Sequence, residues 1–574
     1  MKAERRYAVL MLSGFLGCLS VCIGLKAATA ADSSSTAAQP VSEPTGSANS
    51  GWWDTVLRGG PNGPILGNHS ETLGDFHISG FLQNQTGMWV NSSNLRQFTT
   101  YKTPHSNSLA TERNWMSVDT NYNIGPNSFF LRWYGVYEPA YPNENNLYRA
   151  AGPNTTGPIS DFYNQWTVRD AWWKLKEGPL TVFTGRQIVI WGESISFRVC
   201  DVVNPQDISY AFGFANLEQS RMPLWMLHPI LDLPNWGPLA SNDLEVVFAP
   251  GLQPLYTNDD YPDDRQVGRH NVLGSVDILP PAQGARFAGR PYPIAIPLQL
   301  PKGAPLDLAA FPQIVGVPGP TRWYFPPATW SNAQEGVRLH TFLSDAELTS
   351  FYWYGHQITP TSFVNGTPHH QFISEEFPPL NDVGFTGNRP LYLPGRIAEV
   401  LPFVLRSELL LQDRTPINTQ ALNEASAVSS SSTLNTLVAL DLASAYAPWL
   451  TKTGTLTAHL EWNNYTILSW SKKYVYGGSA MHRYHNDEQL LLSLGSSWLW
   501  NEIAPTLTGI YNPDGTTFEL FPDLLLTPHW SNLYTLDLKY IGILGNNKYG
   551  GATGGVFKGK SMFVMTFQYN FNLL

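Results

Sequence analysis

The sequence predicts an all-β chain that forms a transmembrane antiparallel β-barrel, and three observations support this fold class. Charged residues make up only 14 % of the 574 residues, whereas aromatic residues make up 13 %, a balance that suits a surface partly facing lipid. Alternating apolar and polar segments of about ten residues are separated by short turns on one side and long polar loops on the other. The C-terminal stretch KSMFVMTFQYNFNLL alternates in the same way. An exported β-sandwich or propeller would need neither the loop asymmetry nor such a final strand.

The N-terminus predicts export. A basic stretch (1–6) precedes an apolar stretch (7–25), and the small-residue cleavage signal Ala-Thr-Ala follows at 28–30. This order is that of a secretory signal peptide, which we place at residues 1–30. We therefore expect the mature chain in the outer membrane of a Gram-negative bacterium.

The remaining chain divides into a flexible periplasmic N-terminal segment (31–73), rich in small polar residues at its start, and the barrel (74–574). Cys200 is the only cysteine beyond the signal, so no intrachain disulfide is expected. The formal charge of −10 gives no indication of a nucleic-acid partner. No later stretch is long and apolar enough for a transmembrane helix, so a membrane-embedded chain must form a closed barrel.

We expect about eighteen strands, within a range of roughly 14–18, with short periplasmic turns and long extracellular loops. The strands should begin near residues 76, 114, 129, 164, 180, 221, 242, 333, 347, 391, 402, 434, 454, 488, 504, 516, 532 and 560. The long extracellular loops should be 91–113, 139–163, 251–332, 358–390, 413–433, 466–487 and 544–559.

One further connection, residues 192–221, has a different composition. The preceding strand, LTVFTGRQIVIW (180–191), should end on Trp191 at the outer interface, and Gly192 should let the chain leave the sheet. The connection itself mixes apolar residues with charges of both signs, so we expect it to fold inward against the barrel wall. Opposite charges on an inward loop would produce a constriction with a transverse field, which is a selectivity device of pores.

Charged residues within strands should face the lumen or an interface, because a cation facing mid-membrane lipid costs about 2–4 kcal/mol. Arg406 and Glu408 share a face and could form an ion pair. The alternative to solute contact is a structural ion-pair network inside the barrel. The strand charges concerned also include Arg132, Arg338, Glu461, Asp537 and Lys539. The candidate constriction and lumen residues are Arg169, Arg186, Glu193, Arg198, Asp201, Asp207, Glu218, Arg221, Arg406 and Glu408.

No catalytic residue, metal site or cofactor is predicted. Ser194 follows Gly192-Glu193 but is not within a G-x-S-x-G turn, and Glu193 with Asp201 is a weak carboxylate pair. The histidines of MHRYHNDE (481–488) and the aspartates of 259–264 are better explained as loop residues. Two other functional classes remain open. A lipid or glycan hydrolase would need Ser194 or Ser196 beside a histidine, and a surface receptor or adhesin would use loop 251–332.

The region 165–250 resembles a family of proteobacterial exported proteins known as domain of unknown function 1302. The resemblance rests on Gly185-Arg186-Gln187, Trp191-Gly192-Glu193, Asn204-Pro205-x-Asp207, Pro223-x-x-Met226-Leu227 and Leu405-Arg406-Ser407-Glu408. It implies an outer-membrane β-barrel, a porin or transport channel for a small solute or a lipid-like molecule. It also implies an inner-membrane exporter of the resistance-nodulation-division type and a periplasmic lipid-binding protein as partners. No substrate, cofactor or catalytic residue comes with it.

The remaining partners follow from the predicted location. An outer-membrane barrel contacts membrane lipid and lipopolysaccharide, and its terminal strand resembles those recognised by the barrel-assembly machinery. This strand departs from the usual pattern in one respect, because it ends on Asn572-Leu573-Leu574 rather than on an aromatic residue.

Overall fold

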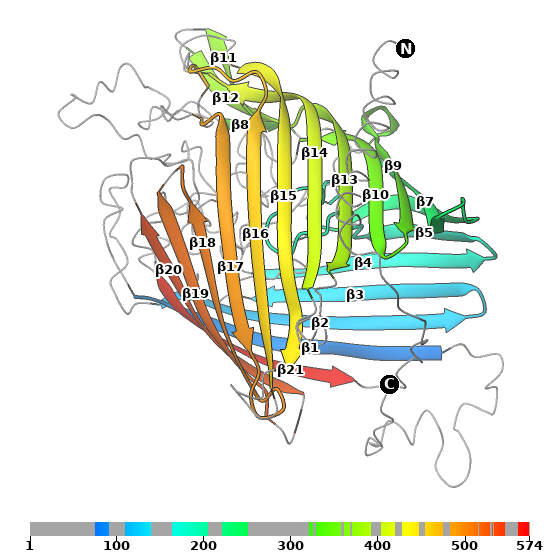
Figure 1. The fold of residues 1–574 in the computed structure, drawn as a ribbon, viewed down its shortest axis with the longest axis vertical. Helices are drawn as coiled ribbons and strands as arrows, with labels where there is room; N and C mark the ends of the chain where they lie inside the picture. Colours follow the sequence, from blue (N-terminus) through cyan, green and yellow to red (C-terminus); the bar gives the residue numbers. More distant parts are fainter. Residues whose placement is uncertain are drawn as a thin grey trace, which may run out of the picture.

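In a computed structural model, the fold is one closed wall of antiparallel strands (Figure 1). The structure describes residues 75–90, 109–137, 139, 164–204, 221–250, 321–324, 329–357, 361–367, 370–391, 403–419, 428–446, 454–474, 483–514, 516–528, 531, 533–545 and 561–572. Among these residues, no helix is long and apolar enough to cross a membrane. The predicted signal peptide and the N-terminal segment 31–73 lie outside the described residues.

The main sheet contains 18 strands, each paired with its neighbour along the chain, and β1 pairs with β21 to close it. The predicted strand number is therefore confirmed. The strands are β1 (Asp75–Trp89), β2 (Leu109–Ile124), β3 (Asn127–Tyr137), β4 (Asn164–Glu177), β5 (Leu180–Gln187), β6 (Leu224–Leu233), β7 (Leu239–Ala249), β9 (Gln334–Leu343), β10 (Ala346–His356), β13 (Pro379–Leu391), β14 (Phe403–Asn418), β15 (Val428–Tyr446), β16 (Thr455–Ile467), β17 (Asn486–Ser496), β18 (Ile503–Asn512), β19 (Thr517–Leu526), β20 (Tyr534–Gly545) and β21 (Met562–Asn572).

The two faces of the wall differ in the way that the alternating sequence predicts. In β17, Leu490, Leu492 and Leu494 are exposed, whereas Leu491 between them is 2 % exposed. In β21, the aromatic and methionine side chains at alternate positions are exposed in the same way. Because successive side chains of a strand point to opposite faces, one face is apolar and outward and the other lines the lumen.

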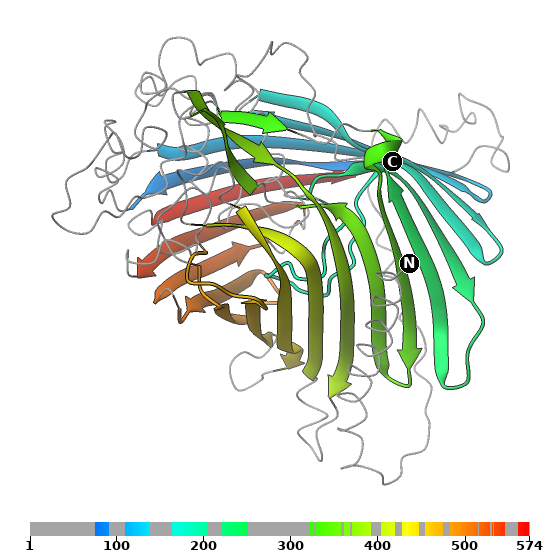
Figure 2. The same cartoon turned by 90° about the horizontal axis from the view of Figure 1, so that it is seen from above.

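A small second sheet lies beyond one end of the barrel (Figures 1 and 2). It contains β8 (Thr321–Tyr324), β11 (Thr361–Thr367) and β12 (His370–Glu376), in the order β11-β12-β8. Its strands come from two of the predicted long loops, 251–332 and 358–390. These two long connections therefore contain regular structure of their own. They lie at the end of the barrel opposite the tight hairpins, one of which is the turn at Gly125 between β2 and β3.

Two expectations about the strands were wrong. Residues 413–418 and 428–433 were assigned to a loop but belong to β14 and β15. The second error concerns a whole strand. Residues 379–390 were predicted to belong to a loop, with the next strand beginning near 391, yet they form β13 and pair with both β10 and β14. The stretch contains glycine, proline and asparagine and therefore looks like a loop. Its Gly384 is explained by packing, because a Cβ atom there would collide with the ring of Phe351 on β10.

Candidate functional site

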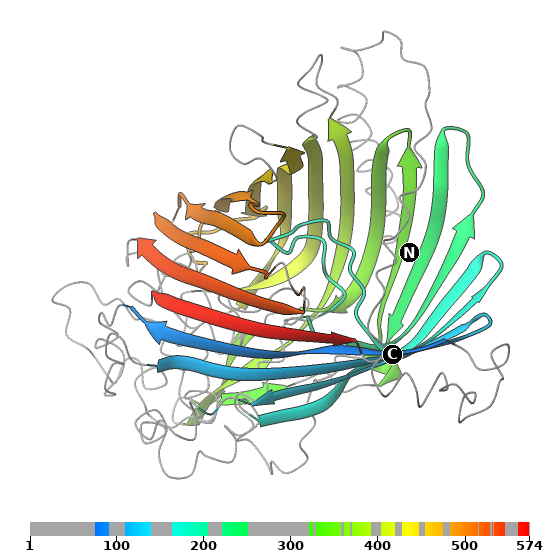
Figure 3. The same cartoon turned by 90° about the horizontal axis from the view of Figure 1, so that it is seen from below.

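The chain between β5 and β6 turns into the barrel. Regular pairing of β5 ends at Gln187, and residues 188–204, here called the lumen segment, continue as irregular chain. This coil lies inside the curved wall in the views from above and from below (Figures 2 and 3). The inward folding predicted for residues 192–221 is confirmed for residues 192–204, and it begins four residues earlier than expected, at 188.

Trp191 anchors the lumen segment and corrects a prediction. It is 1 % exposed, so it is not an interfacial residue at the end of a strand. Its ring packs against the rings of Phe351 and Trp353, with 5.1 Å and 5.6 Å between the ring centroids. Its Nε1 donates a hydrogen bond to the Glu245 carboxylate at 2.9 Å. The apolar run from residue 188 to 191 is therefore explained by burial within the barrel rather than by the membrane.

The lumen segment reaches far around the wall from its origin on β5. Ser194 and Phe197 contact Glu461 on β16, which lies eight strands from β5 by way of β6, β7, β9, β10, β13, β14, β15 and β16. In a barrel of 18 strands this is close to the opposite side. The lumen segment therefore crosses the interior of the barrel.

The second half of the lumen segment is fixed by ion pairs. Asp201 is paired with Arg198 at 3.0 Å and with Arg221 at 2.8 Å, and its side chain is 3 % exposed. Asn204 accepts a hydrogen bond from the backbone N–H of Val189 at 2.7 Å and so joins the two ends of the segment. The predicted charges of both signs are present, but these particular residues neutralise one another.

Cys200 is completely buried at the wall. Its thiol donates to the backbone carbonyl of Leu409 at 3.5 Å, and burial, with the Glu408 carboxylate nearby, raises the pKa of the thiol well above its ordinary value. The thiolate is the reactive form of cysteine, so this thiol is protected while the lumen segment stays in place.

Arg406 and Glu408 both hold the lumen segment, but they do not form the ion pair that the sequence suggested. Arg406 donates through Nε to Asp441 at 2.5 Å and through Nη1 to the backbone carbonyl of Glu193. Glu408 accepts hydrogen bonds from backbone N–H groups of the segment instead. Because the two side chains bind a carbonyl and N–H groups of the same stretch, they act on it together.

Glu193 is the acidic group of the lumen segment that has the least compensation. Its carboxylate accepts a hydrogen bond from Asn388 at 3.3 Å, and the same amide donates to Glu347 at 2.7 Å. Burial and the neighbouring Glu347 carboxylate raise the pKa of Glu193. A glutamate in this position is therefore a titratable charge within the lumen.

The remaining candidates are placed as follows. Arg169 faces the lumen and donates to the carbonyl of Arg221 at 2.5 Å. Arg186 does not face the lumen, because its cross-strand partners are Ala171 and Trp225, and Trp225 is 52 % exposed on the outer face. Its guanidinium binds backbone carbonyls near the end of β5. Asp207 and Glu218 lie outside the described residues.

Ion-pair networks on the lumen wall account for most of the other strand charges, as one of the two sequence-based interpretations proposed. Arg132 pairs with Asp119 at 2.6 Å, and Arg338 pairs with Glu245 at 2.5 Å. The sequence did not single out Glu245, Asp441 or His459, which support the lumen segment. The only sequence signal for them is a charged residue within an alternating strand.

The side of the lumen segment that faces away from the wall is partly apolar. Ile190 is 46 % exposed and Ile195 is 57 % exposed, although both belong to a segment that lies inside the barrel. They alternate with residues that are buried against the wall, such as Trp191. The segment therefore has exposed aliphatic side chains on either side of Glu193 in the sequence.

Ser194, one of the two serines named for the hydrolase alternative, donates its hydroxyl to a carboxylate and not to a histidine. Ser194 Oγ donates to Glu461 at 2.8 Å, and the other oxygen of Glu461 interacts with His459 Nε2 at 2.9 Å. In a Ser-His-Asp triad the imidazole must accept the serine proton directly, so this order of groups differs from that of a triad. Within the described ranges there is no cluster of three or more potential metal-binding side chains.

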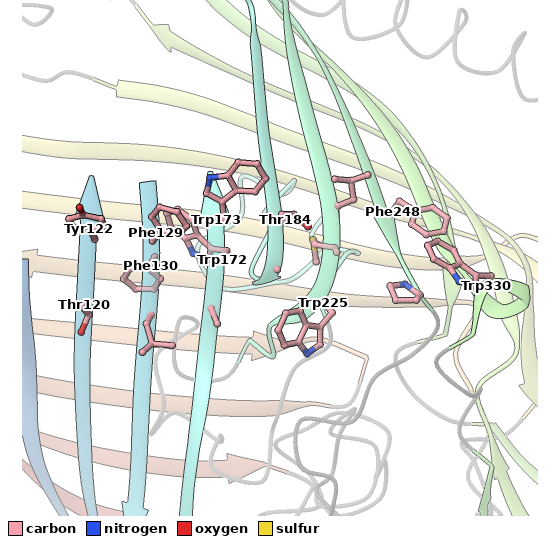
Figure 4. A pocket seen from close by; sticks show the side chains of 16 residues that line it. Thr120, Tyr122, Phe129, Phe130, Trp172, Trp173, Thr184, Trp225, Phe248 and Trp330 are labelled. Atoms are coloured by element: carbon pink, nitrogen blue, oxygen red, sulfur yellow. The ribbon is translucent and has the colours of Figure 1, made fainter. Parts of the chain in front are cut away.

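A second hollow, of about 620 Å³, lies on the outside of the wall over β2 to β7 (Figure 4). Trp225 and Leu227 line it and alternate with Leu224 and Met226, which are buried in the barrel. None of its 16 lining residues is charged. This hollow belongs to the apolar outer face, and its few polar side chains, such as Thr120, Tyr122 and Thr184, carry no charge.

These features define a transmembrane-type β-barrel whose interior is crossed by a folded-in segment. Residues 23–235 match the model of a family described as "Protein of unknown function (DUF1302)", which confirms the resemblance found in the sequence. No curated protein matches the chain.

Three solved structures illustrate the similarity in fold. Acinetobacter baumannii OccAB3 has 10 % identity and a TM-score of 0.43 over 87 % of this chain and 99 % of its own. A BenF-like porin from Pseudomonas fluorescens Pf-5 has 8 % identity and a TM-score of 0.44 over 87 % and 100 %. Pseudomonas aeruginosa OpdK with vanillate has 8 % identity and a TM-score of 0.44 over 87 % and 99 %. Likeness at this level decides nothing about this chain, whose architecture follows from its own strand pairing.

Proposed function

We propose that this chain is an outer-membrane channel of a Gram-negative bacterium, in which a small solute crosses the barrel past the lumen segment without any catalytic step. The observation that carries the proposal is the lumen segment itself, which runs from β5 to Glu461 on β16 inside a closed barrel. An inward segment with charged groups is a recurrent device for narrowing a pore and selecting its solutes.

The solute that suits this lumen is small and partly apolar, or lipid-like. Ile190 and Ile195 would contact it on one side, and Glu193 supplies a charge beside them. Polar side chains of the wall, such as Gln568 on β21, offer hydrogen bonds elsewhere in the lumen. The direction of movement would be set by the partners, for which the family resemblance suggests an inner-membrane exporter and a periplasmic lipid-binding protein.

The rival classes have less support. A hydrolase would require a base that takes the proton of Ser194, and this hydroxyl is bonded to Glu461 instead of an imidazole. A receptor or adhesin would depend on loop 251–332, most of which lies outside the described residues. The apolar outer face supports contact with membrane lipid and lipopolysaccharide, and β21 supports recognition by the barrel-assembly machinery.

Deletion of residues 195–215 tests the channel function. We expect a higher single-channel conductance in planar bilayers, because the part of the segment that crosses the lumen is removed. A matched control is deletion of residues 548–556, which belong to the predicted extracellular loop 544–559 and should leave the conductance unchanged. An equal conductance of the wild type and the 195–215 deletion would refute the proposed constriction.

A further inference from the structure

Two carboxylates are buried in the middle of the lumen wall. Glu408 on β14 is 2 % exposed and Glu461 on β16 is 0 % exposed. Burying an ionised carboxylate is costly unless hydrogen bonds or charges compensate it. The two carboxylates therefore need hydrogen-bond donors or positive charges as partners.

The lumen segment supplies the compensation for Glu408 through its backbone. One carboxylate oxygen, Oε1, accepts from the N–H groups of Glu193 and Ser194, the latter at 2.5 Å. The other oxygen, Oε2, accepts from the N–H group of Cys200 at 2.7 Å. Three N–H groups that have left the β-sheet converge on one side chain, and hydrogen bonds to a charged acceptor are the strong kind.

Glu461 binds the same stretch from another strand. Its Oε1 accepts from Ser194 Oγ at 2.8 Å and from the N–H group of Phe197 at 3.1 Å. Its Oε2 interacts with His459, which also contacts Asp441. The carboxylate is thereby fixed on one side by the wall and on the other by the lumen segment.

We propose that Glu408 and Glu461 are positioning residues for the constriction, which hold the lumen segment across the barrel and so set the size of the pore. The inference rests on the channel function proposed above. Arg406 completes the arrangement, since it donates to the Glu193 carbonyl between the N–H groups that Glu408 binds. Neither carboxylate touches the passing solute, because both are buried beneath the segment.

Because Glu408 and Glu461 are buried, their positioning role can be distinguished from a direct effect of their charge on the conductance. A lumen carboxylate in contact with water would change conductance by its own field. Glu408 and Glu461 can act only through the lumen segment, since it lies between them and the open space. Glutamine at either position keeps the volume but removes the charge and turns one acceptor into a donor, which would oppose the backbone N–H groups.

Cys200 provides a readout that does not depend on conduction. It is 0 % exposed while the segment is docked, and it is the only cysteine outside the predicted signal peptide. Release of the segment would expose the thiol to a maleimide reagent. The rate of labelling in the folded, full-length barrel therefore reports the position of the lumen segment.

The test compares E408Q, E461Q and the double variant with the wild type. We expect each single variant to increase the labelling rate of Cys200 about tenfold, because losing hydrogen bonds to a charged group shifts an equilibrium by at least this factor. The single-channel conductance should rise in parallel.

Two controls accompany the test. D523N removes a lumen carboxylate that is paired with Lys539, away from the lumen segment, and should leave Cys200 labelling unchanged. C200S in the E408Q background should abolish labelling. Heat-modified migration in gels confirms that each barrel is folded.

The outcomes separate the two proposals. Folded E408Q and E461Q barrels that label at the wild-type rate would overturn the positioning role, whether or not the channel conducts. Faster labelling without conductance in any variant would support the positioning role and overturn the channel. Higher conductance in the deletion alone, with no change in E408Q and E461Q, would leave the channel and remove the positioning role.

Discussion

Buried charges are compensated in different ways in two parts of the lumen wall. On β19 and β20, Lys539 pairs with Asp523 at 3.1 Å and with Asp537 at 3.7 Å, so these ion pairs form within the wall itself. On β14, Glu408 is compensated by backbone N–H groups of the lumen segment, and on β16 Glu461 is compensated by Ser194 and Phe197 of the segment together with His459 of the wall. The ion pairs of the first wall form without the lumen segment, although one oxygen of Asp523 and one of Asp537 accept no hydrogen bond from the described residues, whereas the hydrogen bonds of the second wall form only when the segment is docked.

This difference indicates where the molecule can change its shape without losing its barrel. The strand pairing of the wall does not depend on the lumen segment, because it is formed by neighbouring strands throughout. The lumen segment is held by side chains of the wall, so single substitutions can weaken its docking one contact at a time. Substitutions in the segment and in the wall that receives it are therefore expected to change the pore and the exposure of Cys200 while the strand pairing of the barrel is kept.

The largest effect is expected for Trp191→Ala. Trp191 fills the space between Phe351 and Trp353, and truncating a buried tryptophan costs about 3–5 kcal/mol. We expect a loss of this size in the unfolding free energy, measured by urea titration in lipid vesicles, together with faster labelling of Cys200. Trp330→Ala is the matched control, because Trp330 is 79 % exposed on the outer face. Equal effects of the two variants would contradict the anchoring role of Trp191.

A smaller effect is expected for Lys539→Met on the wall of β19 and β20, whose ion pairs do not involve the lumen segment. The substitution leaves Asp523 and Asp537 without their shared cation and should destabilise the barrel by about 1 kcal/mol, since the pair is partly exposed. The labelling of Cys200 should not change. If Lys539→Met released the lumen segment as Glu408→Gln does, the two walls would not be independent.

The smallest effect is a pH dependence carried by Glu193. Its raised pKa means that the carboxyl ionises at a higher pH than an ordinary glutamate. Its contribution to stability is thus present below the ordinary pKa and is lost as the pH rises through the raised one. Cation preference should increase over the same range, as the reversal potential in a salt gradient would reveal. Glu193→Gln should abolish this step, and Glu177→Gln at the β4–β5 hairpin should retain it.

The sequence predicted the barrel well because alternation is a local property. Each strand shows its two faces within about ten residues, so the count of strands and the position of most hairpins followed directly. β13 was missed because Gly384 and the prolines at 379 and 390 look like loop residues. Gly384 is explained only by the Phe351 ring that packs against it.

The site could be predicted only in part. Glu193, Arg198, Asp201 and Arg221 were found because they cluster in one unusual connection. Glu461 was expected to face the lumen, but its contact with Ser194 joins residues 267 positions apart, which no local pattern reveals. Arg186 was misplaced because a charged residue beside the predicted constriction was assigned to the lumen without regard to the alternation of its strand.

The sequence by itself determined the class of fold, the number of strands and the presence of an inward connection, because hydrophobic alternation and an apolar loop are properties of short stretches of chain. The tertiary structure decided where β5 ends, that Trp191 lies inside the barrel, and that Glu408 and Glu461 receive the lumen segment. These facts depend on closure of the barrel, which brings β5 and β16 to opposite sides of one lumen and so makes partners of residues that are distant in sequence.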